Sequence, residues 1–333
     1  STNWWAPAGS SADHTLVVDG VPRSFRLRVP KSYDATRPAP LVLVFHAYYD
    51  TSRDIEQLTR FSIMAENEGF VAVYPQGQGD INDEAAGDDG APGWQSWNGG
   101  GCSQSPGPLG ETCKQWKDGN EYWYGTESLH YKSCENVKKA PGHWEGVGSA
   151  RKCITSGCNC CSCADDTGFV RALLSKLQSD LCVDRRRIYA AGFSYGAMFS
   201  LALAQTTPPL LLSAVVSVAG GLLRGFHEPM QPTASSAIAV MDVHGTNDDQ
   251  VPTNSSATGK EGKWATSYDG WMYTPMDEVL TAHAQYSGCS EPAAAGAPRW
   301  DTPWSTGGAE YRRYDALSCT ASTRGCRNNT EIV

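Results

Sequence analysis

The stretch RIYAAGFSYG, residues 187–196, places a serine between two glycines where an apolar segment meets a helical one. Residues 187–191 have the composition of a buried strand, and residues 195–205 have the apolar spacing of a helix. Gly192-Phe193-Ser194-Tyr195-Gly196 therefore fits the G-x-S-x-G pattern, in which a sharp strand-to-helix turn lifts a serine hydroxyl above a sheet. We interpret Ser194 as a nucleophile; the alternative is a chance match in a chain with 34 glycines.

Strands and helices alternate outward from this stretch, which predicts an α/β fold with a mostly parallel sheet and helices on both faces. The 333 residues fit a single domain over 1–333. Further strands are predicted at 16–20 and 24–29 (a hairpin about Asp19-Gly20), 41–45, 70–74, 214–218, 237–243 and 311–314, and further helices at 55–65, 166–180 and 276–287.

Composition excludes several classes of protein. With 40 % apolar and 19 % charged residues, the chain is neither disordered nor a coiled coil. The net charge of −9 argues against a nucleic-acid partner. No stretch approaches the roughly 18 uninterrupted apolar residues of a membrane-spanning helix.

Residues 80–164 lack periodicity and hold most of the cysteines. We expect them to form a disulfide-rich, Cys/Trp-rich insertion subdomain, because so long an irregular loop needs covalent cross-links to be stable. The adjacent pair Cys160-Cys161 suits a structural zinc site poorly, so no metal is expected. The insertion's tryptophans either line a binding surface or fill a small core. Its eight cysteines are 102, 113, 134, 153, 158, 160, 161 and 163.

Twelve cysteines are typical of an oxidising compartment. Glycosylation sequons at Asn254 and Asn328 agree with this location. Because the chain opens on Ser1, we expect a mature secreted or cell-surface product whose leader has been removed.

A serine nucleophile needs a base and an orienting acid. Asp248, in HGTNDDQVP at residues 244–252, directly follows the strand 237–243, so its carboxylate reaches the same end of the sheet. Asp248 is the expected acid, with Asp249 as second choice. The alternative is that the two aspartates only form a polar turn.

No histidine is evident as the base. His283 lies inside the helix 276–287 and is expected to be a packing or surface residue. His46 and His244 each end a strand and are expected to be core histidines that anchor their loops. His227 is a remote substitute. An oxyanion hole would use the Tyr195 amide together with that of Ala47 or Tyr48.

Taken together, several motifs resemble secreted esterases of the polyhydroxybutyrate depolymerase and feruloyl esterase group, which are similar to carbohydrate esterase family 1. The resemblance implies an α/β-hydrolase fold and hydrolysis of an ester substrate, including polymeric ones, without metal or cofactor. It carries Ser194 over as nucleophile and Asp248 as acid. The motifs are His46-Ala47, Trp97-Asn98-Gly99-Gly100, residues 165–173 (DDTGFVRAL), residues 182–189 (CVDRRRIY), the serine turn and His244-Gly245-Thr246-x-Asp248-x-x-Val251-Pro252.

The chain departs from this family in three places. The family shows His-Gly where this chain has His46-Ala47, and alanine resists positive φ. The bulky Tyr195 narrows the pocket. The family's histidine follows one more strand, and residues 330–333 (TEIV) resemble that strand's start, so we expect the base and its loop after Val333. The alternative is a relative that has lost its base and acts as an extracellular binding or structural protein.

Overall fold

The structure is a computed structural model. It describes residues 8–79, 95–101, 109, 162, 164–206, 210, 212–226, 238–245, 247–253, 265–267, 271–286, 304–306 and 309–311. The eight cysteines of the expected insertion and the sequons at Asn254 and Asn328 lie outside these residues, as does His227.

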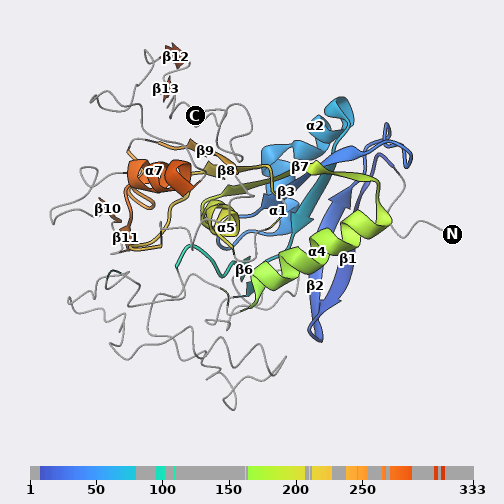
Figure 1. Ribbon diagram of the computed structural model, residues 1–333, viewed down its shortest axis with the longest axis horizontal. Helices are drawn as coiled ribbons and strands as arrows, with labels where there is room; N and C mark the ends of the chain where they lie inside the picture. Colours follow the sequence, from blue (N-terminus) through green and yellow to red (C-terminus); the bar gives the residue numbers. More distant parts are fainter. Residues whose placement is uncertain are drawn as a thin grey trace.

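A seven-stranded sheet forms the centre of the molecule (Figure 1). Its order is β1-β2-β4-β3-β7-β8-β9; β1, β2 and β4 pair antiparallel, and the five strands from β4 to β9 pair parallel. The strands are β1 (Ser11–Val18), β2 (Val21–Arg28), β3 (Ala39–Phe45), β4 (Val71–Pro75), β7 (Val183–Phe193), β8 (Ala214–Val218) and β9 (Ala239–Val243). The predicted mostly parallel sheet is confirmed.

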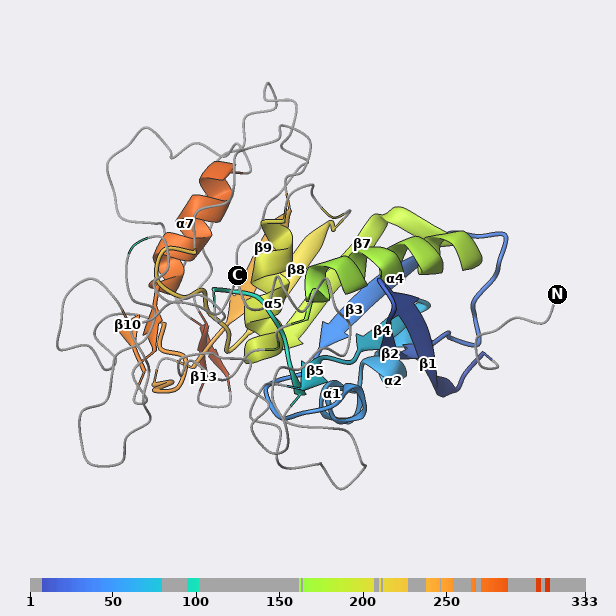
Figure 2. The same cartoon turned by 90° about the horizontal axis from the view of Figure 1, so that it is seen from below.

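Helices cover both faces of the sheet, as predicted (Figure 2). On one face lie α1 (Ser52–Thr59) and α2 (Phe61–Glu68), which bury Ile55 and Ala65 against β3 and β4. On the other lie α4 (Asp166–Asp180), α5 (Tyr195–Ala204) and α7 (Met276–Tyr286). Alternate residues of each buried strand face the two layers, so both faces exclude water.

The predicted single helix over 55–65 is wrong in one respect: the chain forms two helices there. Arg60 adopts a left-handed conformation with φ 54°, and its amide caps α1 on the Glu56 carbonyl. The bend lets Phe61, at the start of α2, meet Phe70 edge-on at 6.2 Å. Tertiary packing therefore interrupts a helical pattern that contains no glycine or proline.

Three short strand pairings complete the description. β5 (Gln78–Gly79) pairs with β6 (Gln95–Ser96), and β10 (Ala265–Thr266) pairs with β11 (Met272–Tyr273). β12 (Trp304–Thr306) pairs with β13 (Ala309–Tyr311), so the strand expected at 311–314 is found earlier, and 312–314 lie outside the described residues.

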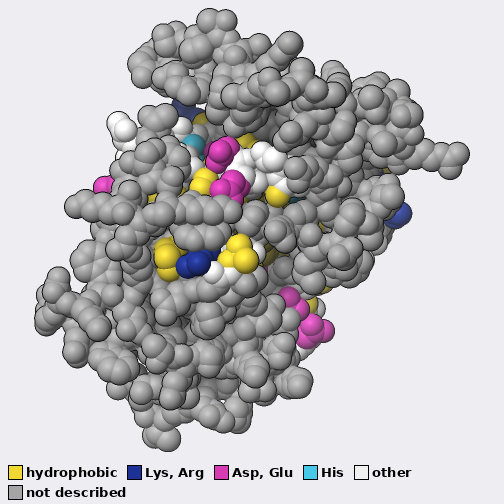
Figure 3. All heavy atoms as spheres, turned by 60° about the vertical axis from the view of Figure 1, so that its left-hand side comes forward, with side chains coloured by type: hydrophobic (Ala, Val, Ile, Leu, Met, Phe, Trp, Pro, Cys, Tyr) yellow, Lys and Arg dark blue, Asp and Glu magenta, His cyan; other side chains and the backbone are white. Residues whose placement is uncertain are grey.

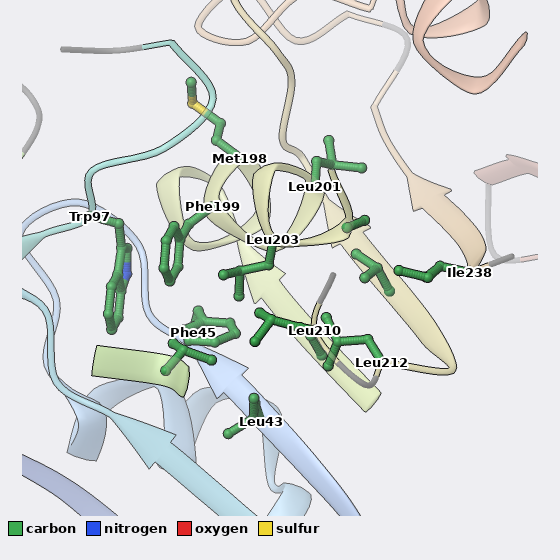
Figure 4. Packing of buried hydrophobic residues seen from close by; sticks show 14 of the residues in the cluster. Leu43, Phe45, Trp97, Met198, Phe199, Leu201, Leu203, Leu210, Leu212 and Ile238 are labelled. Carbon is green, nitrogen blue, oxygen red and sulfur yellow. The ribbon is translucent and has the colours of Figure 1, made fainter. Parts of the chain in front are cut away.

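An aromatic cluster fixes α5 against the end of β3 (Figure 4). Trp97 stacks on Phe199 with ring centroids 5.0 Å apart, and both meet Phe45 edge-on. The indole nitrogen of Trp97 donates a hydrogen bond to the His46 carbonyl at 2.8 Å. All three rings are fully buried, so this cluster holds the carboxyl end of β3 at a set distance from the serine turn.

Candidate active site

Ser194 occupies a strained turn between β7 and α5. Its φ of 52° and ψ of −117° lie outside the regions that L-residues prefer. Its amide donates to the Val218 carbonyl at 2.9 Å, and its carbonyl accepts from the Met198 amide at 3.0 Å. The turn therefore has the conformation that the G-x-S-x-G pattern predicts, and the side chain remains partly exposed.

The two flanking glycines are required by close backbone approach. A Cβ on Gly192 would lie 2.1 Å from the Gly196 carbonyl oxygen, and one on Gly196 would lie 2.3 Å from the Phe45 carbonyl oxygen. The first turn of α5 thus packs directly on the end of β3. This contact brings the Tyr195 amide toward the loop at Ala47 and Tyr48.

The loop after β3 accommodates the alanine that replaces the family's glycine. The positive φ in this loop falls at Tyr49, with φ 73°, and not at buried Ala47. The Tyr49 amide donates to the Gln95 carbonyl at 2.9 Å, which ties the loop to β6. The Tyr48 ring lies 5.7 Å from that of Tyr195, centroid to centroid.

Ser194 and the Asp248 loop emerge from the same edge of the sheet. Phe193 pairs with Val218 and Val218 with Val243, so Ser194, Ala219 and His244 follow three neighbouring strand ends in step. Neighbouring strands lie about 4.8 Å apart, which separates the outer two strands by roughly 10 Å. An imidazole with one hydrogen bond at each end spans such a gap.

Asp248 both folds its loop and presents an oxygen outside the turn. Its Oδ1 accepts from the amides of Gln250 and Val251, each at 2.9 Å. Its Oδ2 lies 3.5 Å from the His244 ring nitrogen Nε2, and the side chain is 21 % exposed. The neighbouring Asp249 is exposed. The polar turn considered as an alternative therefore exists, but its backbone hydrogen bonds engage only one of the two carboxylate oxygens of Asp248.

The described histidines have separate environments. His46 is fully buried: its Nδ1 donates to the Ala47 carbonyl at 2.7 Å, while its Nε2 accepts from the Gly77 amide at 2.9 Å. Burial lowers the pKa of His46 to about 4 and that of His283, inside α7, also to about 4. His46 is thus the core histidine that was expected, and His283 is the expected packing residue.

A buried ion pair between β2 and α4 was missed from the sequence. Arg23 of β2 donates to Asp166 at the start of α4, and both side chains are buried. The other oxygen of Asp166 accepts from the Asn98 amide at 2.7 Å and the Ser162 hydroxyl at 2.6 Å. One feature of the sequence could have revealed the pair: Arg23 alternates with Phe25 and Leu27, which places it on the apolar face of β2.

Acidic side chains, a histidine and apolar side chains are visible together on the side of the molecule that carries α7 (Figure 3). In the part of the chain that the structure describes, no helix has the length and apolarity needed to cross a membrane.

Comparison with known proteins agrees with this geometry. Residues 164–266, which contain Ser194 and Asp248, match the Phospholipase/Carboxylesterase family model. The chain has the α/β-hydrolase fold. The parts of this fold described above are the serine turn, the parallel strands β4, β3, β7, β8 and β9, and the loop after β9 that carries Asp248.

The chain is similar to curated fungal enzymes. It is 29 % identical over 194 residues to feruloyl esterase C of Emericella nidulans, an alignment that covers 54 % of this chain and 64 % of that enzyme. A 41-residue stretch is 51 % identical to feruloyl esterase B of Piromyces equi and covers 12 % of this chain and 8 % of that enzyme. The matched part thus spans less than two thirds of these relatives.

Two solved structures align with the chain at low similarity. An acetyl xylan esterase from Aspergillus awamori superposes with a TM-score of 0.38 and 12 % identity, covering 72 % of this chain and 74 % of that one. The structure described as sOPH Native gives a TM-score of 0.44 and 14 % identity, with 86 % and 78 % covered.

Proposed function

We propose that this protein is a serine esterase that hydrolyses carboxylic esters through an acyl-enzyme. The observation that carries the proposal is the strained turn at Ser194, whose hydroxyl stands two strands from the Asp248 loop. Non-glycine residues are held at such φ/ψ values mainly where the strain serves function. The relatives named feruloyl esterase support the same reaction.

In the proposed reaction the Ser194 hydroxyl oxygen bonds to the ester carbonyl carbon and gives its proton to an imidazole. The carbonyl oxygen becomes an oxyanion, which the amides of Tyr195 and of Ala47 or Tyr48 stabilise. The alcohol then leaves with the proton from the imidazolium. Water repeats the sequence on the acyl-enzyme and releases the acid.

The imidazole of this relay is not among the histidines that the structure describes. Both ring nitrogens of His46 are held by backbone groups, and His283 is buried within α7. The ring nitrogens of His244 face Asp242 and Val251. Asp248 would orient the relay histidine through its Oδ2, since its Oδ1 is held by two backbone amides.

For the substrate we favour an aromatic acyl ester on a polysaccharide, such as a feruloyl ester; acetyl and hydroxyalkanoate esters are the alternatives. The rings of Tyr48 and Tyr195 lie 5.7 Å apart, centroid to centroid, and Tyr49, the next residue of the same loop, is 63 % exposed. An exposed aromatic side chain on the loop of the proposed oxyanion hole suits a planar acyl group. We also propose that the protein is secreted, disulfide-bonded and glycosylated at Asn254 and Asn328.

Labelling with a fluorophosphonate probe tests the proposal. An intact-mass shift on the wild-type chain that is absent from Ser194→Ala, together with release of ferulate from methyl ferulate, supports the esterase. A wild-type chain that takes up no probe and turns over neither methyl ferulate nor p-nitrophenyl acetate overturns it. That result would indicate a hydrolase relative without catalysis.

A further inference from the structure

The imidazole of His244 lies between two hydrogen-bond acceptors. Its Nδ1 faces the Asp242 carboxylate at 3.3 Å, and its Nε2 faces the Val251 carbonyl at 2.7 Å. A neutral imidazole carries one N–H and therefore satisfies only one acceptor, whereas an imidazolium satisfies both. The His244 side chain is 5 % exposed and that of Asp242 is 7 % exposed, so water does not substitute for the missing donor.

The Val251 carbonyl belongs to the loop that carries Asp248. The Val251 amide donates to Asp248, while the Val251 carbonyl faces His244, so one residue links the acid to the imidazole. The Val251 side chain is buried, and the Met276 amide at the start of α7 donates to the Thr253 carbonyl. The loop is thus held at its middle by His244 and at its far end by α7.

Asp242 supplies the negative charge on the strand side. It pairs in register with Ser217 of β8, and both side chains are buried. Among the described residues, no hydrogen-bond partner lies at the second Asp242 oxygen or at the Ser217 hydroxyl. A buried carboxylate with so few donors holds its charge best beside a cation.

We propose that His244 is a positioning residue: an imidazolium that donates to both Asp242 and the Val251 carbonyl, and so fixes residues 247–251 in the shape that presents Asp248 to the proton relay. This inference rests on the proposed function for its catalytic consequence, but the protonation of His244 is independent of it. His244 acts through Asp248 and does not touch the reacting atoms.

The charged groups that face this imidazole, in the described part of the chain, are Asp242 on β9 and Asp248 on the following loop. Hydrogen bonding and charge from Asp242, with smaller contributions from Val251 and Asp248, outweigh burial and raise the pKa of His244 above its usual 6.5. The clamp therefore forms as the pH falls below the raised pKa, and it is lost as the pH rises through that pKa.

Nitrogen NMR of the wild-type chain tests the charge directly. We expect both ring nitrogens of His244 to be protonated at pH 6.5, with a midpoint above that of a free histidine and a lower midpoint in Asp242→Asn. Asp249→Asn is the matched control, because it removes an exposed carboxylate from the same loop and should leave the midpoint in place. An unprotonated Nδ1 at pH 6 in the wild type overturns the inference.

The rate of fluorophosphonate labelling of Ser194 tests the positioning role. The labelling rate should decline at high pH, with a midpoint equal to the midpoint of His244 protonation. Both midpoints should shift together in Asp242→Asn. His244→Gln should lower kcat by about 10²-fold with KM little changed, since a displaced acid misplaces the relay. If Asp242→Asn leaves the midpoint of this high-pH decline unchanged, the positioning role is overturned. No labelling at any pH, with His244 doubly protonated, instead overturns the proposed function and leaves the protonation inference standing.

Discussion

Asp166 at the start of α4 and Arg23 of β2 form an ion pair from which water is excluded on both sides. The guanidinium also lies 4.2 Å above the Phe169 ring. The same carboxylate also accepts hydrogen bonds from the Asn98 amide and the Ser162 hydroxyl, and both residues belong to the segment 80–164 in which the insertion is expected.

Removing one partner of this pair should destabilise the fold strongly. Asp166→Asn leaves the Arg23 charge buried without a counter-charge, so the free energy of unfolding should fall by about 3–5 kcal/mol. The half-exposed pair of Lys176 and Asp180 is the control, and Lys176→Ala should cost less than about 1 kcal/mol. Chemical denaturation measures both, and equal losses would contradict the assignment.

Strain at Ser194 predicts an unusual order of stability. Glycine adopts φ 52° without the penalty that any Cβ imposes, whereas alanine retains that penalty. The free energy of unfolding should therefore be about 1 kcal/mol higher for Ser194→Gly than for Ser194→Ala, and neither variant should take up fluorophosphonate. A Ser194→Gly variant less stable than Ser194→Ala would mean that the turn is relaxed.

Gly196 should not tolerate alanine although it lies in a helix. In an open helix this change stabilises by about 1 kcal/mol, but here the new Cβ would lie 2.3 Å from the Phe45 carbonyl oxygen. We expect a loss of about 3 kcal/mol. Gly245→Ala is the control, because a Cβ there meets no atom within 4 Å. Thermal unfolding of the two variants should separate them clearly.

Acid should destabilise the protein through its buried neutral histidines. The pKa values of His46 and His283 are about 4 in the folded chain, which is lower than the 6.5 of an unfolded histidine. Unfolding therefore takes up protons as the pH falls from 6.5 toward 4. Each site lowers the free energy of unfolding by up to about 1.4 kcal/mol per pH unit in that window. His283→Gln should remove its share of the slope; an unchanged slope would show that His283 is not buried.

Substituting the two neighbouring aspartates, Asp248 and Asp249, should change kcat to very different extents. Asp248→Asn keeps the loop's shape but removes the charge that orients a histidine, so kcat should fall by about 10³–10⁴-fold on the model of other serine triads. Asp249→Asn should stay within about twofold, because Asp249 is exposed. Steady-state hydrolysis of methyl ferulate compares them, and the reverse order would transfer the acid role to Asp249.

Sequence patterns predicted much of the fold because local chemistry decides it. The Asp19-Gly20 turn joins β1 and β2 as expected, with positive φ at both residues. Two consecutive aspartates, Asp165 and Asp166, stand at the start of α4. In the structure Asp165 accepts from the Gly168 amide at 3.1 Å, which leaves Asp166 for Arg23. A side chain's choice between a local cap and a distant partner depends on what the fold brings near.

By itself, the sequence determined the strand-to-helix turn at Ser194, since only glycines fit at 192 and 196 and the flanking patterns have periods of strand and helix. The tertiary structure alone decided the break at Arg60, the burial of Arg23 and the two acceptors around His244. Glycine and periodicity act within a few residues of the chain. Burial depends on how distant segments pack, as for Arg23 and Asp166, which are 143 residues apart, and the folded shape of a loop decides which of its own groups face His244.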